Sequence, residues 1–189
     1  MTGKTNALVS GGGIDDNTIY VSKFAKTIES AFNGQYSVMR NAEVTLLISS
    51  NAVFTTMSNS FNRCQAKTIT INGSTGTVTN FSSAFKENGT YLTTIDGDGL
   101  DFSSATNVGN IFQYTTGIET LIIKANTLGI SLDLSYLQNL NNDSLASIVA
   151  GLKDMTGQTS PTLTLHATPK ANLTAEQLAT ISVKNWTLS

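Results

Sequence analysis

The sequence has very few of the residues on which metal, disulfide and acid–base chemistry depends. Its 189 residues include one cysteine, Cys64, and one histidine, His166. A single cysteine excludes a disulfide within the chain and any cysteine-rich zinc site. A single histidine leaves one position for the side chain that most often serves as general base or metal ligand. Sites that need several such residues are therefore excluded.

Charge and long apolar runs are scarce as well. Charged residues make up 13% of the chain, with 11 Lys plus Arg against 13 Asp plus Glu. This balance provides no basic surface for nucleic acid. No apolar run approaches the roughly 18 residues of a membrane span, and residues 1–10 lack the apolar core of a secretory signal peptide. We therefore expect no nucleic-acid partner, no membrane insertion and no export signal.

Small hydroxyl and amide side chains take the place of the missing charges. The chain has 28 Thr, 20 Ser and 18 Asn, together 66 residues, and only two prolines. Its apolar fraction of 40% and net charge of −2 argue against a disordered chain. The length suits one domain with a sizeable core, or one domain with a short appendage.

A unit made of a strand, a polar loop and a short aromatic motif recurs along the chain. The motifs end at Phe61, Phe85 and Phe112, which are 24 and 27 residues apart. An apolar residue stands four positions before each phenylalanine, a spacing that predicts one helical turn per unit. Strands of mixed Thr, Ile and Leu are predicted at residues 44–48, 68–71, 91–95 and 120–124.

This period predicts the fold class. A single unit cannot cover its own apolar face, so units stack and share one core. We predict a β-rich solenoid (α+β) of about five leucine-rich-repeat-like units, with a parallel sheet on one face and short helical turns on the other. An irregular β-sandwich is the alternative, and the constant spacing argues against it.

The C-terminal part has longer helices and reads as a cap. Strands are predicted at residues 132–135, 162–165 and 186–188. Asp143 is the expected N-cap of a helix that runs through Leu152, with Gly157 as a stop. Thr174 and Gln177 match a capping box that opens a second helix.

The N-terminal part does not repeat. We divide the chain into residues 1–40, an arm and helix that attach, oligomerise or cap, and residues 41–189, the repeat domain with its C-terminal cap. A triple glycine at 11–13 marks a flexible break after an extended arm. The helix is predicted from Phe24, Ile28, Ala31 and Phe32, with residues 33–34 ending it.

Several of these segments resemble the BspA-type leucine-rich repeats. The family's strand is followed by a motif close to Asn-Met-Ser-x-Met-Phe, and residues 56–61 (Thr-Met-Ser-Asn-Ser-Phe) are the nearest copy. Its C-terminal end often contains Leu-Asp-Leu-Ser, Gly-Gln-Thr-Ser, Thr-Leu-Thr-Leu, Leu-Thr and Gly-Trp-Thr-Leu. This chain has the first four at 132–135, 157–160, 162–165 and 173–174, and Trp-Thr-Leu at 186–188 with Asn185 in place of the glycine. The resemblance covers about residues 41–189.

The resemblance implies binding or scaffolding and brings no catalytic residues. Such ends occur in tail, baseplate and other virion proteins of bacteriophages and in bacterial surface proteins. It implies a non-enzymatic bacteriophage virion structural protein on the tail, baseplate or head, which acts as a scaffold or in host attachment. The expected location is the virion, after synthesis in the host cytoplasm. The expected partners are other virion subunits, further copies in a homo-oligomer, and a bacterial surface glycan or protein. The alternative is a cell-surface or secreted adhesion module.

The sequence contains one acidic run with a possible chemical role. Asp96, Asp98 and Asp101 alternate with glycine and are the weak candidates for a calcium site, although the run fails the EF-hand pattern. Asp-Gly pairs are also ordinary turn residues, and a structural turn is the favoured interpretation. The same three acids are the only candidates for a carbohydrate-active enzyme, a third hypothesis. We predict no catalytic residue, no bound metal and no cofactor.

The remaining candidates are weaker. His166 could join Ser160 or Ser135 and Asp133 in a triad, but no nucleophile elbow accompanies them. Cys64 is expected to be a small buried apolar residue. Gly3-Lys4-Thr5 imitates the end of a phosphate loop without the upstream glycine. The phenylalanines are expected in the core, and some tyrosines could line a carbohydrate or protein contact: Tyr36, Tyr91, Tyr114 and Tyr136.

Overall fold

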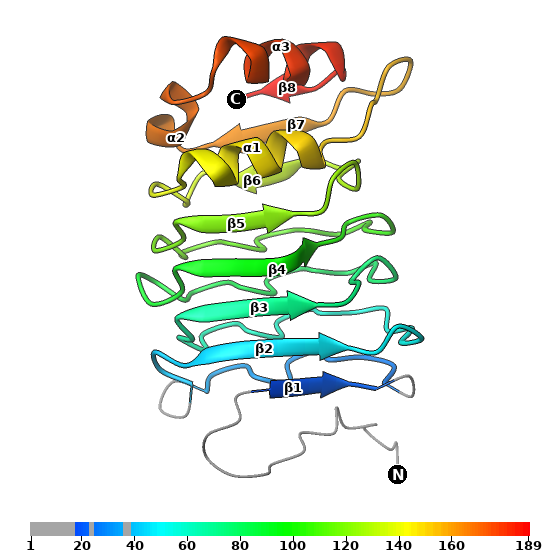
Figure 1. The fold of residues 1–189 in the computed structure, drawn as a ribbon, viewed down its shortest axis with the longest axis vertical. Coiled ribbons are helices and arrows are strands. Elements are labelled where there is room, and N and C mark those ends of the chain that lie inside the picture. The colour runs from blue at the N-terminus through cyan, green and yellow to red at the C-terminus, as the bar shows by residue number, and fades with distance from the viewer. Residues whose placement is uncertain (1–17, 23–24, 36–38) are drawn as a thin grey trace.

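The computed structural model describes residues 18–22, 25–35 and 39–189. In these residues the strands form two parallel sheets, and the helices all follow the larger sheet in the sequence (Figure 1). The predicted arm, its triple glycine, the Gly3–Thr5 motif, Phe24 and Tyr36 lie outside the described residues.

The larger sheet has five parallel strands in sequence order. They are β1 (Thr18–Val21), β2 (Glu43–Ile48), β3 (Thr68–Asn72), β4 (Thr94–Leu100) and β5 (Thr120–Ile123). In β3, Ile alternates with Thr, which places apolar side chains on the core face and hydroxyls on the other. In β5 the same alternation of burial places Leu121 and Ile123 in the core. In register, Ile69 faces Ile95 on the core side, while Thr68, Thr94 and Thr120 align on the open side.

The segment before residue 41 belongs to the same core. Strand β1, which was not predicted from the sequence, pairs with β2. The predicted helix is wrong in its described part, because residues 29–34 form turns. The amides of Ser30 and Phe32 donate to the carbonyls of Ser58 and Ser60 instead of to their own helix. Ile28 and Phe32 are nevertheless buried in the common core.

The helical turns predicted for the aromatic motifs are also wrong. Residues 56–63, 80–87 and 107–114, which we call the turn segments, run in β-turns with left-handed φ at Asn59, Ser83 and Asn110. Alternate amides bond to the next segment, as from Phe61 to the Ala84 carbonyl (2.8 Å). These bonds compete with helix formation. The predicted stacking of the phenylalanines is confirmed, since consecutive ring centroids are 5.2, 5.7 and 5.7 Å apart from Phe32 through Phe61 and Phe85 to Phe112.

Strand β4 begins later than predicted and contains the Asp-Gly run. The register pairs Ile95 with Leu121 but Leu100 with Ile123, so β4 holds three more residues than β5 between these pairs. The excess forms an irregular bulge. Gly97 and Gly99 have φ of +79° and +76°, which explains why glycine alternates with aspartate here.

Helix α1 (Asn142–Gly151) covers the free edge of β5 (Figure 1). Ser144 Oγ accepts the Leu121 amide, and Ser147 Oγ accepts the Ile123 amide, both at 2.9 Å. Two helix side chains thereby replace the carbonyls of a sixth strand. The N-cap is Asn141 and not the predicted Asp143.

The second sheet has the order β6 (Leu132–Leu134), β7 (Thr162–Leu165) and β8 (Thr187–Leu188), all parallel. The short helix α2 (Ala167–Ala171) follows β7, and α3 (Ala175–Val183) precedes β8. The predicted capping box at Thr174 and Gln177 is present. The predicted strands of this region are confirmed, and Trp186 is buried with its Nε1 donating to the Lys153 carbonyl (2.9 Å).

These observations correct the predicted fold class. The β-rich solenoid (α+β) of leucine-rich-repeat type is contradicted: the described residues form a five-stranded parallel sheet with few helices, an α/β-like arrangement. The sheet does not continue through the chain, because α1 closes it at β5 and β6 starts a separate sheet. The turns that were predicted to be helical form no helix. One hydrophobic core nevertheless extends from Ile19 to Trp186, so the predicted boundary at residue 41 does not separate two cores.

Candidate functional site

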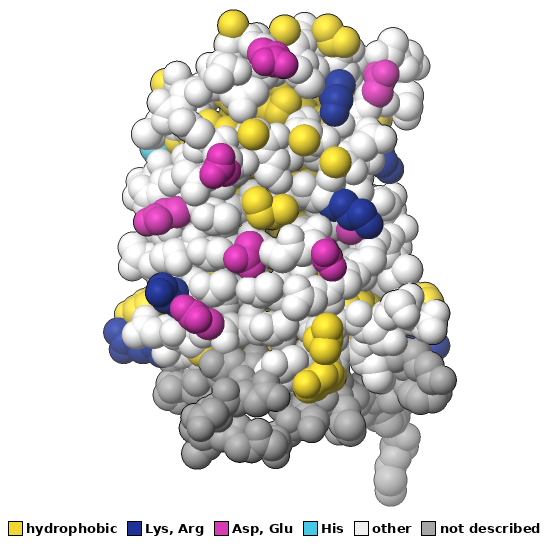
Figure 2. Space-filling view, in the orientation of Figure 1, with side chains coloured by type: hydrophobic (Ala, Val, Ile, Leu, Met, Phe, Trp, Pro, Cys, Tyr) yellow, Lys and Arg dark blue, Asp and Glu magenta, His cyan; other side chains and the backbone are white. Residues whose placement is uncertain are grey.

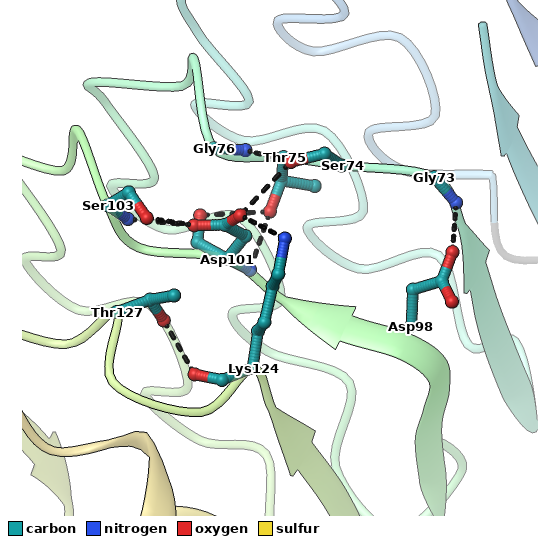
Figure 3. A network of polar contacts seen from close by, with 9 residues as sticks. All are labelled: Gly73, Ser74, Thr75, Gly76, Asp98, Asp101, Ser103, Lys124 and Thr127. Atoms are coloured by element: carbon teal, nitrogen blue, oxygen red, sulfur yellow. Dashed lines mark hydrogen bonds and ion pairs between the residues drawn. The ribbon is translucent and has the colours of Figure 1, made fainter. Parts of the chain in front are cut away.

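Asp101 is the centre of a polar network at the end of β4 (Figure 3). Its side chain is 6% exposed and accepts hydrogen bonds from the Ser103 amide (3.0 Å), the Ser103 hydroxyl (2.5 Å) and the Ser74 hydroxyl (3.0 Å). Lys124 Nζ lies 2.9 Å from Oδ2. The Asp101 backbone is held as well, by both hydrogen bonds that it exchanges with Thr75 Oγ1. The carboxylate therefore joins three neighbouring chain segments.

Two effects set the pKa of Asp101 in opposite directions. Burial of the carboxyl raises its pKa, while hydrogen bonds from Ser103, Lys124 and Ser74 lower it, and the net pKa lies below the usual value. The group is thus an ionised carboxylate at neutral pH with every oxygen engaged. Asp101 therefore stabilises the structure by connecting chain segments. A general acid would need a raised pKa, whereas the pKa of Asp101 is lowered.

The other two acids of the run do not join Asp101. Asp98 is exposed and accepts the Gly73 amide at 2.6 Å, so it is drawn to one side of the network (Figure 3). Asp96 lies on the open face of the sheet beside Thr70, and its Oδ1 is buried without a hydrogen-bond partner. Among the described residues, no three His, Cys, Asp or Glu side chains are grouped as a metal site requires.

The residues of the sketched triad also have separate tasks. His166 is the N-cap of α2, where its Nδ1 accepts the Thr168 amide (3.2 Å). Asp133 Oδ1 accepts the Ser135 amide (2.9 Å), which stabilises the turn after β6. Ser160 Oγ shares a hydrogen bond with Thr187 Oγ1 (3.1 Å). None of these contacts joins the histidine to a serine or to the aspartate.

Cys64 lies in the core, as the sequence predicts. Its side chain is fully buried, and this burial raises the pKa of the thiol to about 11, against weaker lowering by hydrogen bonds with the backbone of Ala66 and Cys64 itself. The thiolate that nucleophilic or redox chemistry needs is therefore strongly disfavoured.

Sequence reasoning missed Asn88, the most extensively bonded buried amide. Its Nδ2 donates to the Phe61 and Phe85 carbonyls (2.9 and 2.8 Å), and its Oδ1 accepts the Gln65 amide (2.9 Å). Its own amide donates to Thr115 Oγ1 (3.1 Å). The only signal was an asparagine three residues after a motif phenylalanine, and the other motifs have no asparagine there. Asn88 stabilises the turns and faces no ligand site.

The candidate tyrosines divide into two sets. The Tyr91 hydroxyl accepts from Arg40 (2.8 Å), whose guanidinium also lies 4.8 Å from the ring centroid. Tyr114 and Tyr136 form an edge-to-face pair with centroids 5.1 Å apart. The Tyr114 side chain is 55% exposed, so this pair presents aromatic surface to solvent.

A small groove separates the last turn segment from the second sheet. Residues 106–110 form one wall, residues 130–133 form the other, and Thr162 and Thr164 of β7 extend the second wall. The volume is about 360 Å³, at the lower end of the range for ligand pockets. The described lining residues include one carboxylate, that of Asp133, and no Lys, Arg or His. Their other polar groups are hydroxyls and amides.

Backbone donors are left open along one wall of this groove. In the preceding turn segment, the amides of Phe81 and Ser83 donate to the Asn107 and Gly109 carbonyls. Residues 108 and 110 line the groove, and their amides, which are the equivalent ones, donate no hydrogen bond within the described residues. The hydrogen-bond ladder between turn segments therefore ends at residues 108 and 110.

Comparison with known proteins adds no relative. The chain matches no protein-family model, no curated protein and no solved structure. In the described part of the chain, no helix has both the length and the apolar character needed to cross a membrane.

Proposed function

We propose that this chain is a non-enzymatic structural protein of a bacteriophage particle, displayed on the tail, baseplate or head, where it acts as a scaffold or binds the host surface. The proposal of a non-enzymatic role rests on one observation: the side chains that could take part in catalysis have structural roles. Asp101 joins three segments, His166 caps a helix and Cys64 is buried in the core. Each of these groups is engaged in holding the backbone or the core.

The surface supports binding through many weak contacts. The face over the main sheet consists mostly of hydroxyls, amides and backbone, with scattered charges and small apolar areas (Figure 2). A rigid parallel sheet presents these groups at a regular spacing. Many copies held in a symmetric array would raise the avidity of such contacts without strong single sites.

The particle setting is supported by the resemblance to BspA-type segments in phage virion proteins. The matching motifs at residues 132–135, 162–165 and 186–188 supply β6, β7 and β8. A cell-surface or secreted adhesion module remains the alternative proposal, because the same motifs occur in bacterial surface proteins.

Mass spectrometry of purified particles tests the setting directly. Particles of a phage whose genome encodes this sequence should contain the chain in a fixed ratio to their head or tail proteins after density-gradient purification. Recovery of the chain in the envelope fraction of uninfected cells, and its absence from particles, would contradict the proposal and favour the adhesion module.

Light scattering during size-exclusion chromatography tests the proposed homo-oligomer. We expect a defined assembly, such as a trimer or hexamer, for the full chain. A shortened chain should begin at Thr18, because a start at Asn41 would delete β1 and the Phe32 ring that stacks on Phe61. A folded monomer from Thr18 onward would assign assembly to residues 1–17, and a full-length monomer would contradict self-assembly.

A further inference from the structure

We infer that the groove between residues 106–110 and the second sheet is a binding site for a neutral saccharide. The inference deepens the proposed host-surface binding and rests on it for the source of the sugar. The chemistry of the walls, the open backbone donors and a neighbouring aromatic pair are independent observations that point to this ligand class.

The side chains of the walls match hydroxyl-rich, uncharged ligands. Thr106, Ser131, Thr162 and Thr164 contribute hydroxyls, and Asn107 and Asn110 contribute amides. Asp133 is the one carboxylate and can accept hydrogen bonds from sugar hydroxyls. The absence of a cation among the described lining residues disfavours phosphate and acidic sugars, because no positive group offsets their charge.

The backbone supplies donors that a sugar can use. Val108 and Asn110 line the groove, and their amides have no acceptor in the described protein, whereas their counterparts in the previous turn segment are paired. Sugar hydroxyls, ring oxygens and acetamido carbonyls are all acceptors. A ligand that accepts hydrogen bonds from these amides and donates one to the Asp133 carboxylate would form hydrogen bonds with both walls of the groove.

Apolar surface completes the site. Val108, Leu132 and Ile130 belong to the lining and are buried or partly buried, so the lining is partly apolar and partly polar. Four residues after Asn110 and three after Asp133, the same two chain segments are joined by the Tyr114–Tyr136 pair. Exposed tyrosine rings stack against the C–H faces of sugar rings, which would extend the site for a longer chain.

The turn-segment wall of the groove suits a peptide strand poorly, although β6 in the other wall is the end strand of its sheet. Strand addition needs an extended edge with donors and acceptors at regular intervals. The wall at residues 106–110 includes the start of the turn segment 107–114, in which Asn110 and Tyr114 have φ of +57° and +59°. This backbone offers single donors and no continuous strand edge.

Amide chemical shifts of the isotope-labelled full chain test the inference. The probes are cellotriose and the N-acetylglucosamine trimer, with a galacturonic acid trimer as the acidic counterpart and a Thr-Val hexapeptide as the strand probe. We expect saturable shifts at the Val108 and Asn110 amides with a neutral sugar, at a dissociation constant on the order of 1 mM. The acidic sugar and the peptide should bind at least about tenfold more weakly.

A matched pair of variants locates the ligand. Thr162→Phe fills the groove from β7, whereas Thr187→Phe places the same side chain on β8, in register with Thr162 but outside the groove. We expect the first variant to weaken sugar binding at least about tenfold and the second to leave it unchanged. The wild-type shift map identifies the groove by itself, so the test holds even if the first variant misfolds.

Three outcomes would overturn the inference. The first is that neither neutral sugar shifts any amide signal at a concentration about 50-fold above the expected dissociation constant of about 1 mM. The others are shifts confined to another surface, or tighter binding of the peptide than of the sugars. Such a result would leave the particle role standing if the chain is found in virions. If the chain binds sugar in the groove but is absent from particles, the proposed virion role is contradicted and the saccharide site still holds.

Discussion

At the scale of single residues, Asp101 carries the clearest electrostatic consequence. Its carboxylate is buried and fully hydrogen-bonded, and its net pKa is lowered on folding. A carboxyl whose pKa falls on folding stabilises the native state above its unfolded pKa of about 3.9, and this stabilisation is lost as the pH falls through the folded pKa.

We therefore predict that Asp101→Asn lowers the free energy of unfolding by about 2–3 kcal/mol at pH 7, because Lys124 and two hydroxyls lose their charged partner. The difference from wild type should shrink below about pH 4. Urea unfolding at several pH values measures it. Asp143→Asn, in the exposed first turn of α1, is the control and should change stability by about 0.5 kcal/mol. A difference independent of pH would contradict the electrostatic account.

Cys64 gives a second prediction at this scale. Because burial raises the pKa of its thiol to about 11 and leaves no exposed surface, native protein should react with a disulfide reagent at pH 8 far more slowly than unfolded protein does. The rate of thiol release, measured with and without guanidinium chloride, provides the comparison. Equal rates in the two conditions would show that the turn around Cys64 opens readily.

At the scale of elements, the end of the main sheet is the critical junction. Ser144 and Ser147 of α1 accept the amides of Leu121 and Ile123 on the outer edge of β5. Ser144 is fully buried and also donates to the Glu119 carbonyl (2.9 Å). Its loss would leave a buried strand amide without an acceptor.

We predict that Ser144→Ala lowers the free energy of unfolding by about 1–3 kcal/mol and accelerates hydrogen exchange at the Leu121 amide. Ser182→Ala, on the exposed surface of α3, is the matched control and should change stability by less than about 0.5 kcal/mol. Unchanged protection of Leu121 in the Ser144 variant would mean that another group covers this edge.

Elements also show which sequence signals were reliable. Alternation of Thr with Ile or Leu predicted β3 and β7 at nearly their observed bounds, because the alternation is a local property of one strand. The i to i+4 spacing in the aromatic motifs predicted helical turns and failed. The side chains do reach the core, but in the first two motifs the amides bond to the next turn segment, 23 to 26 residues away, as from Phe61 to Ala84 and from Phe85 to Ile111.

At the scale of the whole molecule, the two sheets share one core. Buried side chains form a single cluster from Ile19 in β1 to Trp186 beside β8. Helix α1 contacts β5 of the larger sheet and also α3, which in turn contacts β8 of the second sheet. No polar layer or linker divides the described core.

We therefore predict one cooperative unfolding transition. Fluorescence of Trp186, the only tryptophan, reports on the C-terminal region, whereas the NMR amide signals of β2, β3 and β4 report on the larger sheet. The two signals should give the same midpoint in urea. Separate midpoints would show that the second sheet unfolds as an independent unit.

The sequence by itself determined the parts that depend on local patterns: most strands, the α3 capping box, the buried phenylalanines and Cys64, and the scarcity of charge. The candidate groups Asp96, Asp98 and Asp101 were identified, but their separation was not, because it depends on Lys124, Ser74 and Gly73 from other segments. The open groove was not foreseen either. It exists because the hydrogen-bond ladder ends at Val108 and Asn110 and a new sheet begins at β6. Only the tertiary structure decides where the ladder ends, because each of its hydrogen bonds joins segments that are distant in the chain.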